Sequence, residues 1–597
     1  MAIYKAPVED VLFILGEVLH YERYSNLPGF SDAPPDVLEA ILAEGAKLCE
    51  EAIQPLNAVG DREGCTRHPD GSVTTPAGFK AAYDAYRNGG WLGLSAPADY
   101  GGQGLPMTLN TVMQEFISSA NLAFGMYPGL TQGAIAALLV HGSQEQKRTY
   151  LPKMITGEWA GTMNLTEPHC GTDLGLLKTK AVPQPDGSYA LSGTKIFISA
   201  GEHDLAENII HLVLARIEGA PEGTRGISLF VVPKFLVQAD GTLGARNGVS
   251  CGSIEHKMGI HGNATCVMNY DGARGWLVGG ENKGLAAMFV MMNEARLAVG
   301  MQGLSQSEVA CQNAAAYARE RLQGRALTGP KFPDKPADPI IVHPDVRRTL
   351  LQIRAFNEGA RALALWAALS SDVAHRSPDP KERQAADDRL QLLTPVIKGV
   401  FTELGFANAV QAQQVFGGHG YIEETGMSQF VRDARITMVY EGANGVQAMD
   451  LVGRKLGRDG GRAVMTFFGE VAAFCRENAE EEALKPFVAS LAKSLEHAQA
   501  SAMWFAQNAM AKPDNAGAGA TDFMHLLGLL AMGYMWGRMA KAALAKKAAG
   551  EDPGGRMEAK LITARFFAEH MLPETSLRYR RIQAGASAVM AMPAEMF

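Results

Sequence analysis

The sequence predicts an α+β protein in which helical and strand-forming stretches occupy separate parts of the chain. Apolar residues recur at helical spacing within the first 160 residues and again from Gly284 onward. Between these two parts lie short runs rich in Ile, Val and Phe, which are typical of strands. Because helices and strands do not alternate, we do not expect repeated βαβ units.

Residues 1–160 predict an N-terminal helical domain. The expected helical stretches are 36–58, 76–90 and 108–158. Pro34 and Pro35 precede the first of them, as is common at the start of a helix. The Gly- and Pro-rich stretch at 97–106 predicts a loop.

Residues 161–283 predict a middle antiparallel β-domain. The candidate strands are Tyr189–Ser199, Asn208–Ile217 and Gly226–Leu236. Asp186-Gly187 is a tight-turn signal directly before the first of them. Strands at such close spacing favour antiparallel pairing between neighbours.

Residues 284–464 predict a four-helix bundle, and residues 465–597 predict an additional C-terminal helical domain. The bundle helices are expected at 284–322, 344–373, 383–416 and 444–456. Pro-rich stretches at 330–339 and 378–380 separate three of them. The later helices are expected at 466–512, 521–549 and 556–570. A linker is expected at Pro513–Ala520 (PDNAGAGA).

The charge balance argues against a nucleic-acid partner. Lys and Arg total 55 against 63 Asp and Glu, so the formal net charge is −8, whereas nucleic-acid-binding proteins usually carry a basic face. The seven cysteines form no CxxC pair, which is typical of reduced thiols. We therefore expect a cytoplasmic protein.

The sequence predicts no signal peptide and no membrane span. The N-terminal stretch carries Glu9 and Asp10 before a short apolar run and has no small-residue cleavage site. The apolar run Leu526–Gly537 is about a dozen residues long, whereas a membrane helix needs about 20. We interpret this run as a buried helix.

Two common nucleotide motifs are missing from the sequence. No GxGxxG opens a helix after a strand, and no GxxxxGK[ST] occurs. A Rossmann dinucleotide site and a P-loop are therefore unsupported. If a nucleotide cofactor binds, another fold must hold it.

The loop Met163–Asp173 (MNLTEPHCGTD) combines hydroxyl groups, Gly and Pro where helices give way to strands. Such a loop can present N–H groups and hydroxyls to a flat polar ring, although a plain turn is the alternative. His169, Cys170 and Asp173 do not make a metal motif, because zinc needs three or four converging ligands and no second cluster follows. Adjacent His and Cys side chains also point apart on an extended chain, which argues against a Cys–His nucleophile. We predict no metal site.

Two further segments lie in the predicted bundle. Gln414–Tyr421 (QVFGGHGY) follows a long helix, and its glycines allow a bulky anionic group to approach the backbone. A helix cap and turn is the alternative. Arg432–Gln447 contains Glu441 after Met-Val-Tyr and before Gly442. A carboxylate among apolar groups is a strengthened base, but the residues alone favour an exposed loop glutamate.

Taken in order and spacing, the three segments resemble the acyl-CoA dehydrogenase family. The family pattern TEP-x-x-G-[ST]-D occurs at Thr166–Asp173, Q-x-x-GG-x-G at Gln414–Gly420 and RD-x-R-x-x-x-x-YEG at Arg432–Gly442. Supporting matches are Lys195–Ser199, Lys257–Gly259, Asn293–Arg296 and Tyr317–Arg321. The resemblance covers about residues 35–460. The block after residue 465 is similar to the extra C-terminal helical domain of a long subgroup.

The resemblance implies FAD as the cofactor and an acyl-CoA as the substrate. In the family, FAD lies between the β-domain and the helical bundle. The residue at the position of the family base, here Glu441, removes the α-proton while the β-hydrogen leaves as hydride to the flavin. Hydrogen bonds from a flavin ribityl hydroxyl and from the N–H of the base residue stabilise the enolate-like transition state. The residues predicted to contact substrate are Thr172, Arg296, Tyr440 and Gly442.

Eight residues match family positions that contact FAD. Met163, Leu165 and Thr166 are expected along the flavin, Phe197 and Ser199 on its other side, and Arg321, Gln414 and Gly418 at the FAD of a neighbouring subunit. An Arg guanidinium suits a diphosphate because its two N–H groups can donate together.

Three positions depart from the family pattern. Phe197 stands where many members have Trp, so an aromatic face remains but the indole N–H is missing. Gln323-Gly324-Arg325 replaces the usual Phe-Gly, and Ala443 replaces the usual Thr after Glu-Gly. The alanine at position 443 removes one hydroxyl contact to FAD.

The resemblance predicts α,β-dehydrogenation of a medium- to long-chain acyl-CoA to the trans-2-enoyl-CoA, the first step of fatty acid β-oxidation. A FAD shared between subunits implies an oligomer, for which we expect a homodimer, and electron-transfer flavoprotein is the expected acceptor. Three alternatives remain: dehydrogenation of 3-(methylthio)propanoyl-CoA, an acyl-CoA oxidase that uses O2, and a non-enzymatic family member.

Overall fold

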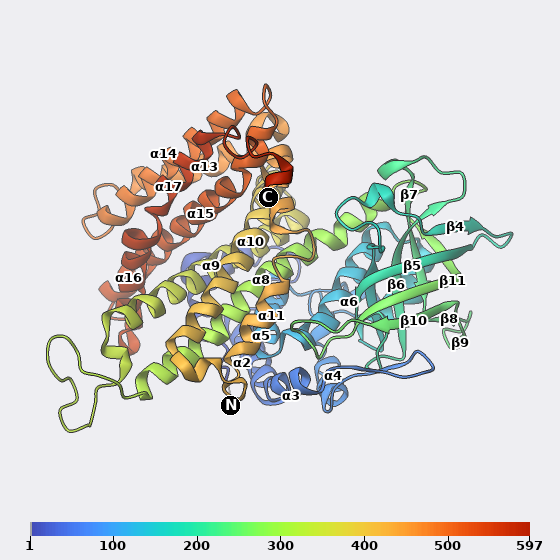
Figure 1. The fold of residues 1–597 in the computed structure, drawn as a ribbon, viewed down its shortest axis with the longest axis horizontal. Helices are drawn as coiled ribbons and strands as arrows, with labels where there is room; N and C mark the ends of the chain where they lie inside the picture. Colours follow the sequence, from blue (N-terminus) through green and yellow to red (C-terminus); the bar gives the residue numbers. More distant parts are fainter. Residues whose placement is uncertain (1–2) are drawn as a thin grey trace. The chain divides into compact units, whose positions relative to one another are not determined.

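The computed structural model describes residues 3–597, which divide into two compact units (Figure 1). One unit comprises residues 44–298, and the other comprises residues 1–43 and 299–597. The first two residues of the predicted N-terminal domain lie outside the described residues.

The unit of residues 44–298 begins with helices, as predicted. They are α3 (Asn57–Glu63), α4 (Phe79–Asn88), α5 (Met107–Ala120), α6 (Leu122–His141) and α7 (Gln144–Ile155), after the end of α2 (Pro35–Leu48). The expectation of helices alone was incomplete, because β1 (Thr66–Arg67) pairs antiparallel with β2 (Val73–Thr74). Strands of two residues are too short to show the alternation that identifies a strand.

The remaining strands of this unit lie between residues 159 and 278. They are β3 (Trp159–Asn164), β4 (Lys180–Pro183), β5 (Tyr189–Ser199), β6 (Asn208–Ile217), β7 (Ile227–Pro233), β8 (Phe235–Val237), β9 (Leu243–Arg246), β10 (Val249–Ile254) and β11 (Thr265–Val278). Strand β11 pairs with β5 and β7, β5 with β4, and β6 with β4 and β7, so five strands pair in a closed ring. Strand β3 adds to β6, and β10 adds to β11.

The prediction of an antiparallel domain holds for most of these pairs but is wrong for two. Strand β6 pairs in parallel with both β3 and β4. The turn at Asp186-Gly187 does join the antiparallel pair β4 and β5, and Gly187 has the positive φ of 82° that such a turn requires. Parallel pairing joins strands that are not neighbours in sequence, so local patterns do not reveal it.

The interior of the strand ring is a closely packed apolar core. Its fully buried side chains include Leu191, Val213, Phe230 and Cys266. Both faces of β6 and β7 are buried, which explains why their sequences are continuous apolar runs rather than alternating ones.

The second unit is helical, and the predicted bundle helices are present. Its helices up to residue 450 are α1 (Val8–Phe13), most of α2, most of α8 (Gly284–Glu320), α9 (Pro344–Arg376), α10 (Pro380–Val415), α11 (Met427–Ile436) and α12 (Asn444–Asp450). Helix α12 continues as a single π-helical turn at Leu451–Lys455. The predicted fold class is confirmed.

Helices α13 (Arg462–Glu477), α14 (Lys485–Asn508), α15 (Asp514–Ala548), α16 (Arg556–Phe566) and α17 (Glu574–Ala584) make up the last part of this unit. The single helix expected at 466–512 is interrupted, because Asn478 leaves the helical conformation before a run of three glutamates. The prediction of a linker at 513–520 is wrong. Its residues from Asp514 form the start of α15, where Gly519 allows the ring of Phe505 to approach closely.

One helix among residues 3–597, α6, is long and apolar enough to cross a membrane by length and composition. Its apolar window is 61% buried inside the protein, as expected of a core helix. The run Leu526–Gly537 lies inside α15 and is almost entirely buried, which agrees with its interpretation as a buried helix.

Candidate active site

Strand β3 presents the first predicted site residues on the face opposite its buried polar side chains. Thr162 and Asn164 point into the unit and are fully buried. Thr162 Oγ1 lies 2.7 Å from His211 Nδ1, Asn164 Nδ2 donates to Thr162 Oγ1 at 2.8 Å, and Tyr270 donates to Asn164 Oδ1 at 2.9 Å. Because side chains alternate along a strand, Met163 has the opposite face and is half-buried.

A buried ion pair holds the loop that follows β3. Lys195 Nζ, on β5, donates to Glu167 Oε1 at 2.8 Å and to the Leu165 carbonyl at 2.9 Å. Glu167 also accepts hydrogen bonds from the Thr179 hydroxyl and N–H and from the Lys178 N–H. The two charged side chains are 0% and 3% exposed. The pair therefore ties Met163–Asp173 to β5 and brings Leu165 and Thr166 next to the part of this strand that contains Lys195 and Ile196.

The environment of Glu167 changes the pKa of its carboxyl group. Burial alone would raise the pKa of this carboxyl. The neighbouring Lys195 ammonium and the hydrogen bonds from Thr179 and Lys178 outweigh burial and hold the pKa below its ordinary value.

Phe197 lies in a β-bulge with a left-handed backbone. In the pairing of β5 with β11, Ile198 lies opposite Cys266 and Lys195 opposite Met268, so two residues of β5 face one residue of β11. Phe197 has φ 59° and its ring is 60% exposed. A bulge turns a side chain away from the regular alternation, and here it turns an aromatic ring outward next to Thr166, whose carbonyl accepts from the Ile196 N–H at 2.9 Å.

The end of the loop is exposed and is organised by Arg216. The predicted substrate residue Thr172 is exposed. Arg216 donates to the carbonyls of Gly175 (2.6 Å) and Leu177 (2.8 Å), which fixes the chain directly after Thr172.

The same loop brings Glu167, His169 and Cys170 together. Their potential ligand atoms lie within 4.8 Å of one another, a convergence that the spacing of these residues did not predict. Both oxygens of Glu167 already accept hydrogen bonds from the protein, so the carboxylate is engaged in holding the loop.

Arg296 and Glu294 lie on the first half of α8. The Arg296 side chain is buried, its guanidinium lies 5.9 Å from the centre of the Phe289 ring, and it approaches Asn293 Oδ1 at 3.4 Å. Burial raises the pKa of the neighbouring Glu294 to about 8, a residue to which the sequence assigned no role.

In the other unit, the ends of α8 and α10 are joined by aromatic contacts. The ring of Tyr317 stacks on Phe416 with centroids 4.2 Å apart, and its hydroxyl lies 3.2 Å from His419 Nδ1. Three residues predicted to contact FAD lie at these two helix ends: Arg321, Gln414 and Gly418. All three are exposed, and a side chain at Gly418 would meet no atom within 4 Å.

Arg325, one of the departures from the family pattern, supports the loop that follows α8. It donates to Asp338 Oδ1 at 3.3 Å and to the carbonyls of Phe332 and Lys335. Asp338 is fully buried and also accepts from backbone N–H groups, including that of Ala326, and these donors lower its pKa to about 2 against the effect of burial. The substituted residue therefore stabilises a loop.

The predicted base, Glu441, lies between α11 and α12 in a left-handed conformation. Glu441 has φ 58° and Gly442 has φ 86°. The fully buried Gln447 donates from Nε2 to the carbonyls of both residues at 3.2 Å. A non-glycine residue in this conformation costs about 1–2 kcal/mol, so the surrounding contacts must impose it. The Glu441 side chain is half-buried, not exposed as the residues alone suggested.

Asn444 anchors the same segment to α10. Its Oδ1 accepts from Lys398 Nζ at 3.0 Å and from Thr402 Oγ1 at 3.1 Å, and its Nδ2 donates to the Gly399 carbonyl at 3.1 Å. Tyr440 is held separately, because its hydroxyl donates to Gln302 Oε1 at 2.5 Å. Burial raises the pKa of Tyr440 above its usual range.

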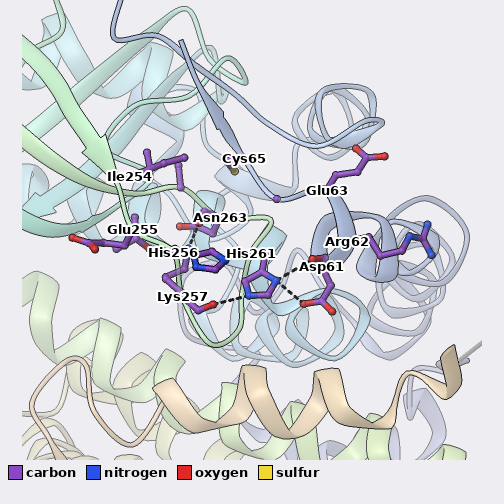
Figure 2. Close-up of a pocket in the computed structure, with 13 residues that line it drawn as sticks. Asp61, Arg62, Glu63, Cys65, Ile254, Glu255, His256, Lys257, His261 and Asn263 are labelled. Atoms are coloured by element: carbon purple, nitrogen blue, oxygen red, sulfur yellow. Dashed lines mark hydrogen bonds and ion pairs between the residues drawn. The ribbon is translucent and has the colours of Figure 1, made fainter. Parts of the chain in front are cut away.

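A small hollow of about 250 Å³ lies elsewhere in the unit of residues 44–298 (Figure 2). His261 lies in its wall, with Nδ1 2.9 Å from the Asp61 carbonyl and Nε2 2.7 Å from the Lys257 carbonyl. Lys257, from one of the supporting motifs, donates to the Asn263 carbonyl at 2.9 Å. Small-molecule pockets usually exceed about 300 Å³, so this polar hollow is too small for a dinucleotide.

Several supporting residues had no role in the sequence predictions. Four of them lie inside the sequence segments described above, but no role was predicted for them: Lys195, Glu167, Gln447 and Asn444. A lysine on the strand-forming run Lys195–Ser199 was a usable signal, because a buried charge requires a partner. Gln447 carried no such signal, because an amide three residues into a helix is common on any surface.

Comparison with known proteins identifies the family. Models of the acyl-CoA dehydrogenase N-terminal, middle and C-terminal domains match residues 36–158, 162–273 and 282–456, and a model described as acetyl-CoA dehydrogenase C-terminal like matches residues 467–593. The chain belongs to the acyl-CoA dehydrogenase family, and it is an FAD-dependent oxidoreductase.

Two relatives match along nearly the whole chain. The 3-methylmercaptopropionyl-CoA dehydrogenase of Ruegeria pomeroyi is 46% identical over 97% of this chain and 98% of that protein. The broad-specificity linear acyl-CoA dehydrogenase FadE5 of Mycobacterium tuberculosis is 37% identical over 96% of each chain. Caenorhabditis elegans ACDH-11, solved in complex with C11-CoA, has the same fold, with a TM-score of 0.79 at 18% identity over 99% of this chain and 96% of that chain.

The chemistry of the predicted FAD residues fits a flavin. The exposed ring of Phe197 offers an aromatic face, Met163 and Leu165 offer apolar surface, and Thr166 offers a hydroxyl. The open backbone at Gly418 and the exposed guanidinium of Arg321 suit a diphosphate. When bound, FAD supplies the two-electron oxidation.

Proposed function

We propose that this protein catalyses the α,β-dehydrogenation of an acyl-CoA thioester with Glu441 as the base. The observation that carries the proposal is the conformation of Glu441. Its left-handed backbone is held by a buried amide that donates to two successive carbonyls. Strained backbone of this kind gathers at sites where the geometry of one side chain matters.

In this proposal the chain contributes a positioned carboxylate and a hydrogen-bond donor. The Glu441 carboxylate takes the α-proton of the substrate and becomes neutral. The N–H of Glu441 donates to the thioester carbonyl and stabilises the charge that develops on its oxygen. Arg296, Thr172, Tyr440 and Gly442 contact the substrate.

The test of the base is Glu441→Gln, which keeps the size of the side chain and removes its basicity. The rate of anaerobic flavin reduction by substrate should fall by about 10²–10⁴-fold, the usual contribution of a general base. Flavin content and acyl-CoA binding should be retained. The control is Glu424→Gln, an exposed glutamate of the 3-10 turn Glu423–Thr425. Substantial dehydrogenation by the Glu441 variant would overturn the assignment.

For the acyl group, we propose a medium- to long-chain substrate, so that the reaction opens fatty acid β-oxidation. Similarity along the whole chain to a broad-specificity linear acyl-CoA dehydrogenase supports this proposal. The higher identity to a 3-methylmercaptopropionyl-CoA dehydrogenase favours 3-(methylthio)propanoyl-CoA as a second candidate. Values of kcat/KM over acyl-CoAs from C4 to C18, with the methylthio thioester included, separate the two.

We also propose electron-transfer flavoprotein as the acceptor and a cytoplasmic homodimer as the working form. The enzyme reduced by substrate should be reoxidised faster by electron-transfer flavoprotein than by O2, whereas the reverse order would favour an oxidase. Light scattering of the purified holoenzyme should give twice the chain mass of 63.9 kDa.

A further inference from the structure

Helix α15 of the C-terminal domain packs against α10 and directly against α12, the helix that follows Glu441. The sequence assigned no chemistry to the block after residue 465. Two contacts of α15 nevertheless lead to the residues that hold Glu441.

The first contact is made by Met524 at a glycine of α10. The position that a Cβ would take at Gly399 lies 2.3 Å from Met524 Sδ and 3.7 Å from Gln447 Cβ. Met524 thus fills the space over Gly399, and the Gln447 side chain borders the same position. Met524 and Gln447 are both fully buried. Gln447 therefore lies beside the position of α10 that Met524 covers, while it donates to the carbonyls of Glu441 and Gly442.

The second contact is polar. His525 Nε2 lies 3.2 Å from Glu403 Oε2, and His525 is buried. The pKa of Glu403 is lowered first by His525 and also by Asn444, the residue that anchors the start of α12 to α10. His525 of α15 and Asn444, three positions after Glu441, therefore both act on the same carboxylate of α10.

We propose that α15 positions Glu441, with Gln447 as the positioning residue that contacts its backbone and Met524 as the residue that holds Gln447 in place. The proposal rests on the role of Glu441 as the base. The C-terminal domain is then part of the machinery that sets the geometry of the base, in addition to covering the bundle.

The physical reason is that the Gln447 hydrogen bonds are long and few. Two bonds of 3.2 Å from one amide restrain Glu441 only while the amide itself cannot move. Loss of Met524 would leave an empty volume beside Gln447, and a neighbouring flexible side chain relaxes toward such a volume. A displacement of about 1 Å at a reacting group can lower the rate 10²-fold.

The experiment compares two methionines of the same helix in the holoenzyme. Met524→Ala removes the neighbour of Gln447. Met532→Ala removes an equally buried methionine whose Cβ lies near Gly359 of α9, away from α12. We would measure the rate of anaerobic flavin reduction, the Kd of acyl-CoA, the thermal midpoint and the amide hydrogen exchange of residues 437–447.

We expect both variants to lose thermal stability, but only Met524→Ala to change the segment of Glu441. Its reduction rate should fall about tenfold or more, with an acyl-CoA Kd within about twofold of the wild type. Its exchange over residues 437–447 should rise, and Met524→Leu should restore both. Equal effects of the two alanine variants on rate and exchange, or no effect of Met524→Ala on either, would overturn the proposal.

Gln447→Met provides a second variant of nearly the same size, in case Met524→Ala does not fold. It should reproduce the loss of rate and the rise in exchange, and adding Met524→Ala should lower the rate further by less than the product of the two single effects. An unchanged rate and exchange in Gln447→Met would overturn the proposal. The exchange measurement does not depend on which residue is the base, so the proposed function can fail in the Glu441→Gln test while the positioning result still stands or falls by itself.

Discussion

Two loops carry most of the predicted site residues, and the protein holds them by different means. The loop Met163–Asp173 is tied to its neighbouring strand by a buried ion pair. The segment Thr437–Gln447 is tied by two amides: Gln447 donates to backbone carbonyls, and Asn444 binds the Gly399 carbonyl and the Lys398 ammonium of α10. Both regions contain a non-glycine residue with positive φ, Phe197 beside the first loop and Glu441 in the second.

The difference follows from what each region has to present. In the proposed function the first loop offers backbone and apolar surface to a flat ring, and a buried ion pair of fixed geometry can hold it rigidly. The second segment presents a carboxylate, whose basicity responds to every charge nearby. Neutral amides at the carbonyls of Glu441 restrain its backbone without placing a charge directly on it.

The largest effect is expected when one partner of the ion pair is removed. Lys195→Met leaves the Glu167 carboxylate buried without its cation and should destabilise the protein by about 3–5 kcal/mol. Chemical denaturation and flavin release measure the loss. The double variant Lys195→Met/Glu167→Met should recover part of it, and a cost below about 1 kcal/mol for the single variant would contradict the role of the pair.

A smaller effect is expected from alanine at the two loop glycines. At Gly442, φ is 86° and a Cβ would lie 2.5 Å from Gln447 Nε2, so Gly442→Ala should cost about 1–3 kcal/mol and lower the reduction rate. At Gly171 the same atom would meet only Thr166 Cγ2 at 3.6 Å. Gly171→Ala should therefore remain within about 0.5 kcal/mol of the wild type, and equal losses in both variants would remove the distinction between the regions.

Acid should distinguish the two regions through the lowered pKa of Glu167. Because its folded pKa is below the unfolded value of 4.5, the ionised carboxylate stabilises the fold above that pH, and this contribution disappears as the pH falls through the folded pKa. The stability difference between wild type and Glu167→Gln should therefore shrink between neutral pH and pH ~3. The difference between wild type and Gln447→Met should stay constant, because neither side chain titrates; denaturation curves over this range test both.

The smallest effect is expected at Phe197. Phe197→Gly relieves the strain of a phenylalanine in the left-handed conformation and removes a ring that is 60% exposed. The free energy of unfolding should therefore increase by less than about 1 kcal/mol. Retention of FAD on gel filtration should fall, since the aromatic face is lost. Unchanged flavin retention would argue against a flavin contact at this ring.

The long helices of the bundle and strands β5, β6 and β7 of the middle domain were predictable because each has a local signal, whereas β3, β4, β9, β10 and β11 were not predicted. Long apolar periodicity identified α8, α9 and α10 almost to the residue, and the Asp186-Gly187 turn was recognisable from two letters. The linker at 513–520 failed for a physical reason. Its glycines look like a flexible linker in sequence, but both lie inside α15, and Gly519 is a close-packing position against the ring of Phe505.

The sequence by itself determined the order of the elements and the positions of the site motifs, because both depend on periodicity and spacing along one chain. The tertiary structure alone decided which residues hold the site residues in place. The pairing of Lys195 with Glu167, the hydrogen bonds from Gln447 to Glu441 and the shared approach of Met524 and Gln447 to Gly399 bring together residues that are separated in sequence, by 77 positions in the case of Met524 and Gln447. Such contacts depend on how elements pack in space, and no local pattern of residues encodes the partner of a buried side chain.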